Sequence, residues 1–193
     1  MNNYRIVTIE MSNRHIHLNE EDLYAIFGEG YRLAVKNMMD NGEFAARETV
    51  TLASPDGELK NVRVMGPPRK NSQAELLLAD CFNLKLQVPI SMSGDLSKAA
   101  PIKVIGPNGT LDLKANAIIA MRHIHIGHDA AASIGYKDGD LVRVKTEGVR
   151  GLIFENTVIR TLPDPGKEGT MHIDFEEGNA AGLMSGSTGF ILE

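Results

Sequence analysis

The run Arg-His-Ile-His-Leu at residues 14–18 occurs again, almost unchanged, as Arg-His-Ile-His-Ile at residues 122–126. Each copy follows a run typical of a β-strand and precedes a run typical of a short helix. A second pair of similar runs, Val-Arg-Val-Met-Gly-Pro at 62–67 and Ile-Lys-Val-Ile-Gly-Pro at 102–107, lies between them. The repeats are consistent either with an internal duplication or with two similar strand ends that converge on one site.

Between the repeats, short strand-like runs alternate with turn signals, which favours small β-barrels over a βαβ sheet. The expected strands are 4–10, 47–53, 58–65, 101–105, 116–121, 140–145, 153–161 and 188–192. The expected helices are 19–28, 72–84, 128–134 and one after Asp174. The second helix is predicted because Ser72 and Glu75 have the spacing of a capping box. The sequence therefore predicts a mainly β, or β-rich α+β, fold.

The composition excludes several classes of protein. The chain has 193 residues, 42% hydrophobic and 23% charged, which is ordinary for a soluble globular protein. A net charge of −5 argues against a general nucleic-acid surface, and no apolar run approaches the roughly 18 residues that span a bilayer. Cys81 is the single cysteine, so an intrachain disulfide is excluded, and the strand-like start leaves no room for a signal peptide. We expect a cytoplasmic protein.

Histidines are the most informative residues in the sequence. Four of the six lie in the two His-x-His runs, as His15, His17, His123 and His125. In an extended strand, residues i and i+2 point to the same face, so both imidazoles of a run can reach one ion. Neutral imidazole suits Zn²⁺, and also Fe, Co or Ni. Two copies, each after a strand, favour metal ligation; the alternative is a pair of hydrogen-bonded strand ends without metal.

Other candidates have weaker signals. His172 is a candidate third nitrogen ligand, whereas the spacing of Glu75 alone favours a helix cap. Arg69 follows two prolines just before the predicted helix, where a guanidinium can bind phosphate bidentately; the alternative is a surface arginine. Cys81 has apolar neighbours at helical spacing, which favours core packing over a nucleophile. The nucleophile-elbow, dinucleotide and Walker patterns are absent, so covalent catalysis has no good candidate.

A series of short motifs extends over nearly the whole chain. In order, these are residues 12–18, 42–45, 48–50, 66–69 with 73–75, 93–95, 106–109, 120–125, and 171–174 with 179–180. The ordered set resembles the PduL-type phosphate propanoyltransferase (phosphotransacylase) family. The order of the motifs is highly specific, although no single motif is.

The resemblance implies two intertwined small β-barrels with short helical caps. Residues 1–13 and 121–193 would form one barrel, and residues 14–120 the other. It also implies two zinc ions close together, with other divalent metals as alternatives. Carried over residue by residue, the ligands of the two ions are His15, His17 and Glu75, and His123, His125 and His172. Arg69 would bind phosphate and act in catalysis, and on Glu75 the resemblance outweighs the capping role.

The activity that the resemblance implies is the exchange of a short acyl group between coenzyme A and inorganic phosphate. Phosphate would attack the thioester directly, which fits the lack of a nucleophile. A binuclear metal hydrolase is the alternative enzyme. His-x-His at a strand end is also typical of amidohydrolase barrels, although those barrels usually need about 250 residues. A non-catalytic metal-binding homologue is the third hypothesis. The expected partners are acyl-CoA and phosphate, with a homodimer as the default assembly.

The sequence departs from the family pattern at several positions. The family's usual Gln-Pro-Gly-Gln-Phe-Ala is Asp-Asn-Gly-Glu-Phe-Ala at 40–45, which places Asn41 and Glu43 in the motif. Ser91 stands where an arginine is common, and Phe175 lies in the acidic run near the C-terminus. The ligands that the resemblance implies are all present. The family's microcompartment members often carry an N-terminal targeting extension, and its absence here favours a freely cytosolic enzyme.

Overall fold

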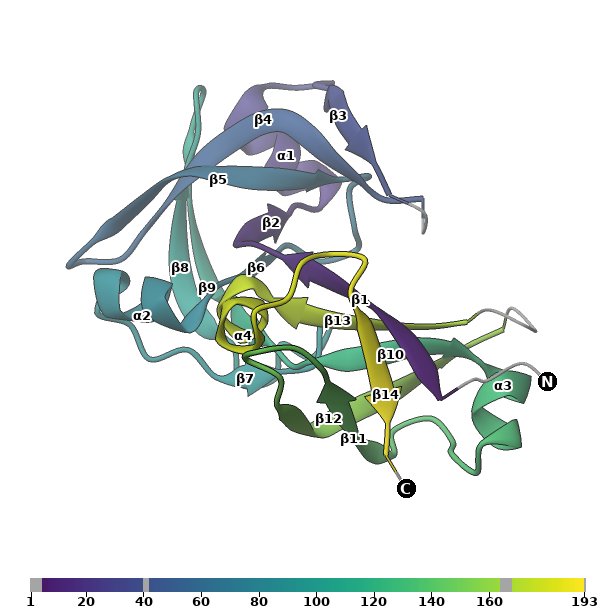
Figure 1. Ribbon diagram of the computed structural model, residues 1–193. Coiled ribbons are helices and arrows are strands. Elements are labelled where there is room, and N and C mark those ends of the chain that lie inside the picture. The colour runs from purple at the N-terminus through teal and green to yellow at the C-terminus, as the bar shows by residue number, and fades with distance from the viewer. Residues whose placement is uncertain (1–4, 40–41, 164–167, 193) are drawn as a thin grey trace. The chain divides into compact units, whose positions relative to one another are not determined.

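The computed structural model describes residues 5–39, 42–163 and 168–192, and Figure 1 shows the arrangement of its strands and helices. The Cα atoms group into two compact units. Unit 1 contains the described parts of 1–13 and 121–193, and unit 2 contains those of 14–120. Each unit has its own hydrophobic core. One strand near the N-terminus therefore belongs to the same unit as the C-terminal third of the chain.

Unit 1 is a closed barrel with the strand order β1-β13-β10-β12-β11-β14. Buried and exposed residues alternate along β11, as expected for strands with one face on a core. Ile9, Ile124, Ile159 and Met171 are fully buried in this core. The elements of unit 1 are β1 (Ile6–Ser12), β10 (His123–Gly127), α3 (His128–Ser133), β11 (Leu141–Thr146), β12 (Ile153–Leu162), β13 (Gly169–Asp174), α4 (Phe175–Ala181) and β14 (Thr188–Ile191).

Unit 2 also closes into a ring of strands, in the order β4-β5-β2-β6-β9-β8, because β8 pairs with both β9 and β4. The strands β3 and β7 extend this ring beside β4 and β9. Ile16, Leu52 and Val64 are fully buried in the core. The elements of unit 2 are β2 (His15–His17), α1 (Glu20–Phe27), β3 (Val35–Met38), β4 (Phe44–Ala53), β5 (Glu58–Gly66), β6 (Gln73–Glu75), α2 (Leu78–Leu84), β7 (Ile90–Ser91), β8 (Ala100–Ile105) and β9 (Thr110–Ala120).

These elements confirm the prediction of a mainly β fold with small barrels and short helices. The first helix lies where its sequence signals placed it. The Asn19 side chain accepts a hydrogen bond from the Asp22 amide at 2.7 Å, and Gly28 ends the helix with a φ of 107°. The predicted turn between β4 and β5 is closed by a hydrogen bond of 2.9 Å from the Ser54 amide to the Gly57 carbonyl.

The prediction of a helix starting at residue 72 was wrong. Gln73–Glu75 form the strand β6 between β2 and β9, and α2 begins only at Leu78. The Ser72 hydroxyl accepts a hydrogen bond from the Asn19 amide at 2.9 Å and donates one to Asp22. Strand pairing on both sides of β6 therefore outweighs the local capping signal. Arg69 is therefore followed along the chain by a strand and not, as predicted, by a helix N-terminus.

Candidate metal centres

The first group of candidate ligands lies on the paired strands β2 and β6 of unit 2. In this antiparallel pair, His15 is directly opposite Glu75. The His15 Nε2 and Glu75 Oε2 atoms are 3.5 Å apart, and the rings of His15 and His17 meet edge to face with centroids 5.0 Å apart. One donor atom from each of the three residues lies within 4.8 Å of the other two. The structure therefore brings together the three residues predicted for one ion.

His17 has the properties of an uncharged ligand. Its side chain is almost fully buried, with 1% exposed. This burial, helped by the nearby charges of His15 and Arg69, lowers the pKa of His17 to about 2, so the imidazole is neutral at physiological pH. Among the described residues, its Nδ1 atom is buried without a hydrogen-bond partner. A neutral imidazole with an unsatisfied buried nitrogen suits metal coordination.

Neighbouring polar groups hold Glu75 as an oriented carboxylate. Its Oε1 atom accepts hydrogen bonds from Gln73 Nε2 at 2.7 Å and Ser93 Oγ at 2.9 Å. Burial alone would raise the pKa of Glu75, but His15, Ser93, Arg69 and Gln73 together keep the pKa below its usual range. The Oε1 atom is thus occupied, while Oε2 faces His15. This arrangement keeps one oxygen available for a cation.

The second group lies on β10 and β13 of unit 1, where His123 is directly opposite His172. Their rings stack at a centroid distance of 5.1 Å, and the His125 ring lies 4.7 Å from His123 and 4.8 Å from His172. One donor atom from each histidine again lies within 4.8 Å of the others. His123 Nδ1 is 2.9 Å from the Met121 carbonyl oxygen, and a proton on Nδ1 would make Nε2 the ring atom that could coordinate a metal.

Both groups fit zinc by donor chemistry and by spacing. Catalytic zinc sites commonly use three protein ligands, such as three histidines or two histidines and a glutamate, and keep a further position open. Two donors that are each about 2.1 Å from a tetrahedral ion lie roughly 3.4 Å apart, which is close to the His15–Glu75 separation. The two groups therefore match the two ligand sets predicted from the sequence.

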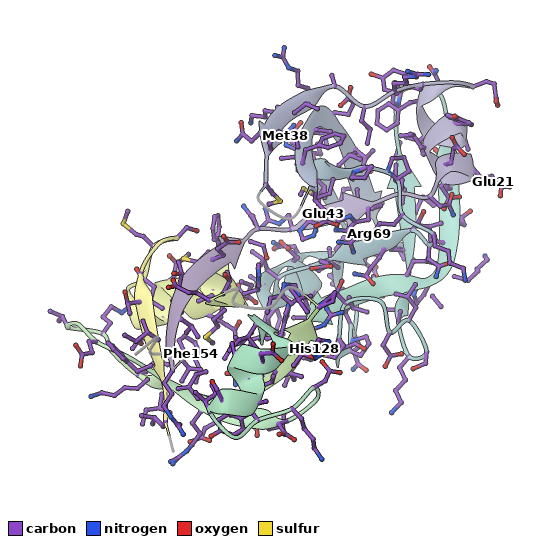
Figure 2. The ribbon with its side chains drawn as sticks, turned by 90° about the vertical axis from the view of Figure 1, so that its right-hand side faces the viewer. Glu21, Met38, Glu43, Arg69, His128 and Phe154 are labelled. Carbon is purple, nitrogen blue, oxygen red and sulfur yellow. The ribbon has the colours of Figure 1, made fainter. Side chains whose placement is uncertain are left out.

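Arg69 lies in the loop between β5 and β6, and its backbone amide donates a hydrogen bond of 2.9 Å to Leu18. Its Nε atom donates to Glu43 Oε1 at 3.0 Å, and Nη2 donates to the same oxygen. Figure 2 shows these two labelled side chains next to each other. Nη1 reaches Ser93 Oγ at 3.5 Å. The guanidinium thus lies near the hydrogen-bond network of Glu75 and is already engaged by a carboxylate.

A cavity of about 300 Å³ lies beside Arg69. Its volume is sufficient for an inorganic phosphate, and two cationic side chains contribute to its wall. The lining residues are Arg69, Lys70, Asn71, Gln73, Gly94 and Leu96. An anion-binding role for Arg69 is therefore compatible with its surroundings.

Sequence reasoning missed the roles of Glu43, Gln73 and Ser93. The Gln73 amide links β6 to the loop after β7, because its Nε2 also donates to Ser93 Oγ at 2.9 Å and its Oε1 accepts from the Gly94 amide at 2.8 Å. No local spacing relates residues 73 and 93, so only the fold brings them together. Cys81 is buried on α2, as predicted.

The remaining departures from the family pattern lie outside both ligand groups. The Ser91 hydroxyl donates to the Asp95 carbonyl at 2.9 Å. Phe175 is the first residue of α4, and Asn41 lies outside the described residues. Within the described part of the chain, no helix is long and apolar enough to cross a membrane.

Comparisons with known proteins agree over most of the chain. The family model described as phosphate propanoyltransferase matches residues 8–184. A protein named phosphate propanoyltransferase from Thermotoga maritima is 45% identical over 189 residues, which cover 97% of this chain and 89% of the relative. Proteins of the same name from Rhodobacter capsulatus and Salmonella typhimurium are 44% and 42% identical, covering 93% and 92% of this chain and 83% and 84% of those relatives.

Proposed function

Because the chain belongs to the phosphate propanoyltransferase family, we propose that it exchanges a short acyl group between coenzyme A and inorganic phosphate with the help of two metal ions. A phosphate oxygen attacks the thioester carbonyl, the carbon–sulfur bond breaks, and the products are an acyl phosphate and coenzyme A. The observation that carries the metal dependence is that each His-x-His strand has a third donor directly opposite its first histidine.

His15, His17 and Glu75 would hold one ion, and His123, His125 and His172 the other. When bound, zinc would supply Lewis-acid stabilisation of negative charge on oxygen and on the leaving thiolate. The residues of the chain prepare these positions, because burial lowers the pKa of His17, and the charge of His15 together with Ser93, Arg69 and Gln73 lowers the pKa of Glu75 against the effect of burial. These two ligands therefore need no change of protonation before they bind a cation.

Arg69 is the residue that we assign to phosphate. A guanidinium presents two parallel N–H donors to an oxyanion, and the cavity beside Arg69 has a second cation in Lys70. The same guanidinium, in contact with Ser93, can stabilise the charge that develops on oxygen during attack. Phosphate must compete with Glu43 for the N–H groups of Arg69, so the ion pair between Arg69 and Glu43 sets part of the phosphate affinity.

The proposal needs no covalent enzyme intermediate. Cys81 lies buried on α2, and its Sγ donates to the Leu77 carbonyl at 3.5 Å. Phosphate is itself the nucleophile, and an alkyl thiol with a pKa of about 8.5 leaves as a thiolate with little acid assistance. Direct attack therefore accounts for the reaction with the groups that the structure provides.

The test is thiol release from acetyl-CoA and propionyl-CoA by zinc-loaded protein, with and without phosphate, together with detection of the acyl phosphate. We expect release that requires phosphate and is lost in His123→Ala. The matched control is His128→Ala, because this histidine begins α3 and belongs to neither ligand group. Release without phosphate would favour a hydrolase, and full metal occupancy without turnover on any short acyl-CoA would favour a non-catalytic protein.

A further inference from the structure

The two ligand groups share an arrangement that extends beyond their ligands. In each, an arginine precedes the His-x-His strand, and the third ligand lies opposite the first histidine. An acidic residue follows the third ligand by five positions, as Asp80 after Glu75 and Glu177 after His172. In both units this acidic residue occupies the third position of the helix that follows the third ligand's strand.

In unit 2, the arginine and the acidic residue are in direct contact. Arg14 Nε lies 2.8 Å from Asp80 Oδ2 and 2.7 Å from Oδ1. The Asp80 side chain is fully buried, and its Oδ2 also accepts a hydrogen bond of 2.9 Å from the Leu77 amide at the start of α2. The residue before β2 is thereby tied to the first turn of the helix that follows β6.

In unit 1, Arg122 makes the corresponding contact with Glu177 through Nη1. Its Nε donates to the Glu155 carbonyl at 2.8 Å, and its guanidinium carbon lies 5.7 Å from the centre of the Phe154 ring. Glu177 is also part of the cap of α4, because its amide donates to Asp174 Oδ1 at 2.8 Å. The residue before β10 is thereby tied to the helix that follows β13.

We propose that Arg14–Asp80 and Arg122–Glu177 are equivalent positioning clamps, each of which holds the strand with two ligands in register with the strand that carries the third. The proposal rests on the metal sites proposed above. Each of these strand pairs is only three residue pairs long, so few ladder hydrogen bonds resist sliding. A contact from the start of one strand to the helix beyond the other adds a second constraint.

Stability alone is a poor explanation for the clamps. Only Asp80 is fully buried, whereas the other three side chains are 22–35% exposed, and partly exposed ion pairs contribute little net stability because solvation and screening offset their attraction. In agreement, burial raises the pKa of Glu177 even though Arg122 opposes the shift. The pairs are thus better explained by geometry, since partners just outside a metal ligand set commonly change metal affinity about 10–100-fold when they are removed.

The experiment measures zinc affinity of the full chain by competition with a chromophoric chelator, well below the unfolding temperature. A His125→Ala background disables the unit 1 group, so the remaining zinc equivalent reports on unit 2. In that background we expect Arg14→Gln to weaken zinc binding about 10–100-fold and Arg122→Gln to leave it unchanged. A His17→Ala background should give the opposite pattern. Lys103→Gln is the matched control, because Lys103 pairs with Asp112 at 2.8 Å away from both ligand groups.

Cobalt loading adds a spectroscopic measurement, since the visible absorption of Co²⁺ reports on ligand geometry. We expect a changed spectrum only at the group whose clamp is removed. Arg14→Lys and Arg122→Lys keep the positive charge and replace the Gln variants if those do not fold. We expect each Lys variant to lose less zinc affinity than the Gln variant, at the same ligand group. Unchanged zinc affinity and unchanged cobalt spectra in folded variants, with only a lower unfolding temperature, would overturn the clamps. Failure of the wild-type chain to bind zinc would instead overturn the proposed metal sites.

Discussion

Glu43 should weaken phosphate binding, and its replacement by glutamine should strengthen it. Two N–H groups of Arg69 converge on one oxygen of Glu43, in the same region as the cavity lined by Arg69 and Lys70. Phosphate must therefore displace or share this carboxylate. Glutamine is nearly isosteric, retains an acceptor oxygen and is the residue that the resembled family usually has at this position. The change Glu43→Gln thus removes the charge and little else.

The size of the effect follows from the exposure of the pair. The Arg69 and Glu43 side chains are 34% and 25% exposed, so solvent screens their attraction. Ion pairs of this kind contribute about 0.2–1 kcal/mol, and repulsion between Glu43 and a phosphate anion acts in the same direction. At about 1 kcal/mol, phosphate affinity changes roughly fivefold. We therefore expect the KM for phosphate to fall about fivefold in Glu43→Gln.

The assay is the initial rate of thiol release at saturating acyl-CoA over a range of phosphate concentrations. Glu48→Gln is the matched control, because this carboxylate of unit 2 accepts hydrogen bonds from Tyr31 and Ala34, outside the phosphate cavity. In an Arg69→Gln background the benefit of Glu43→Gln should shrink, since the contact between the two residues is lost and only the repulsion between Glu43 and phosphate remains. An unchanged or higher KM for phosphate in Glu43→Gln would show that Glu43 does not compete, or that it orients Arg69 productively.

Three further outcomes are expected. Gln73→Leu removes a hydrogen bond to Glu75 and should weaken zinc binding in unit 2 about 10–100-fold, measured by chelator competition, while binding in unit 1 stays unchanged. A strong chelator should abolish phosphate-dependent thiol release and lower the unfolding temperature, and added zinc should restore both; activity that survives complete metal removal would contradict the metal-assisted mechanism. The raised pKa of Glu177 means that the folded state binds more protons than the unfolded state, so its contribution to stability is present below the unfolded pKa and is lost as pH rises through the folded pKa. Urea unfolding from pH 4.5 to 7.5 should accordingly show that wild type loses stability relative to Glu177→Gln, whereas parallel pH profiles would exclude this contribution.

Much of the fold follows from local signals, and the main error came from a local signal as well. Asn19 and Gly28 bound α1 through contacts within the helix or next to it, so sequence spacing is sufficient to predict them. Ser72 and Glu75 have an equally good capping pattern, but Ser72 bonds to Asn19 and Asp22 from a distant part of the chain. The strand β6 exists because β2 and β9 pair with it on both sides. A strand of three residues has no period of its own for a sequence pattern to reveal.

The candidate site could be predicted to a similar extent. Repetition of His-x-His identifies four ligands without knowledge of the fold, because alternation along a strand places both imidazoles on one face. His172 alone has a weak signal and the spacing of Glu75 favours a helix cap, so both depended on the family resemblance, and cross-strand register then places each opposite the first histidine of its group. Gln73, Ser93 and Glu43 come from separate segments of unit 2, and their hydrogen bonds depend on how the loops are closed. Contacts of this kind, outside the ligand groups, can be identified only from the structure.

The two groups of candidate ligands share their arrangement but differ in the third residue, which is a glutamate in unit 2 and a histidine in unit 1. Glu75 and His172 occupy the same place relative to the first histidine, so one arrangement has a carboxylate donor where the other has an imidazole. With a divalent ion, the unit 2 group would carry one positive charge less than the unit 1 group. Unit 2 also has Arg69, whose positive charge affects both His17 and Glu75, so an anionic ligand offsets a local excess of positive charge there.

In unit 1 a carboxylate is present as well, but it lies beside the candidate ligand His172 and is not part of the ligand group. Glu10 Oε2 is 3.7 Å from His172 Nδ1, on the neighbouring strand β1. At 3.7 Å this carboxylate is too far away for a hydrogen bond, and it would act on a metal-bound imidazole through its charge, without neutralising the ion directly. The two groups therefore differ in whether negative charge reaches the ion directly or through an imidazole. If both groups hold a divalent ion as proposed, the unit 1 ion would therefore be the more electrophilic of the two.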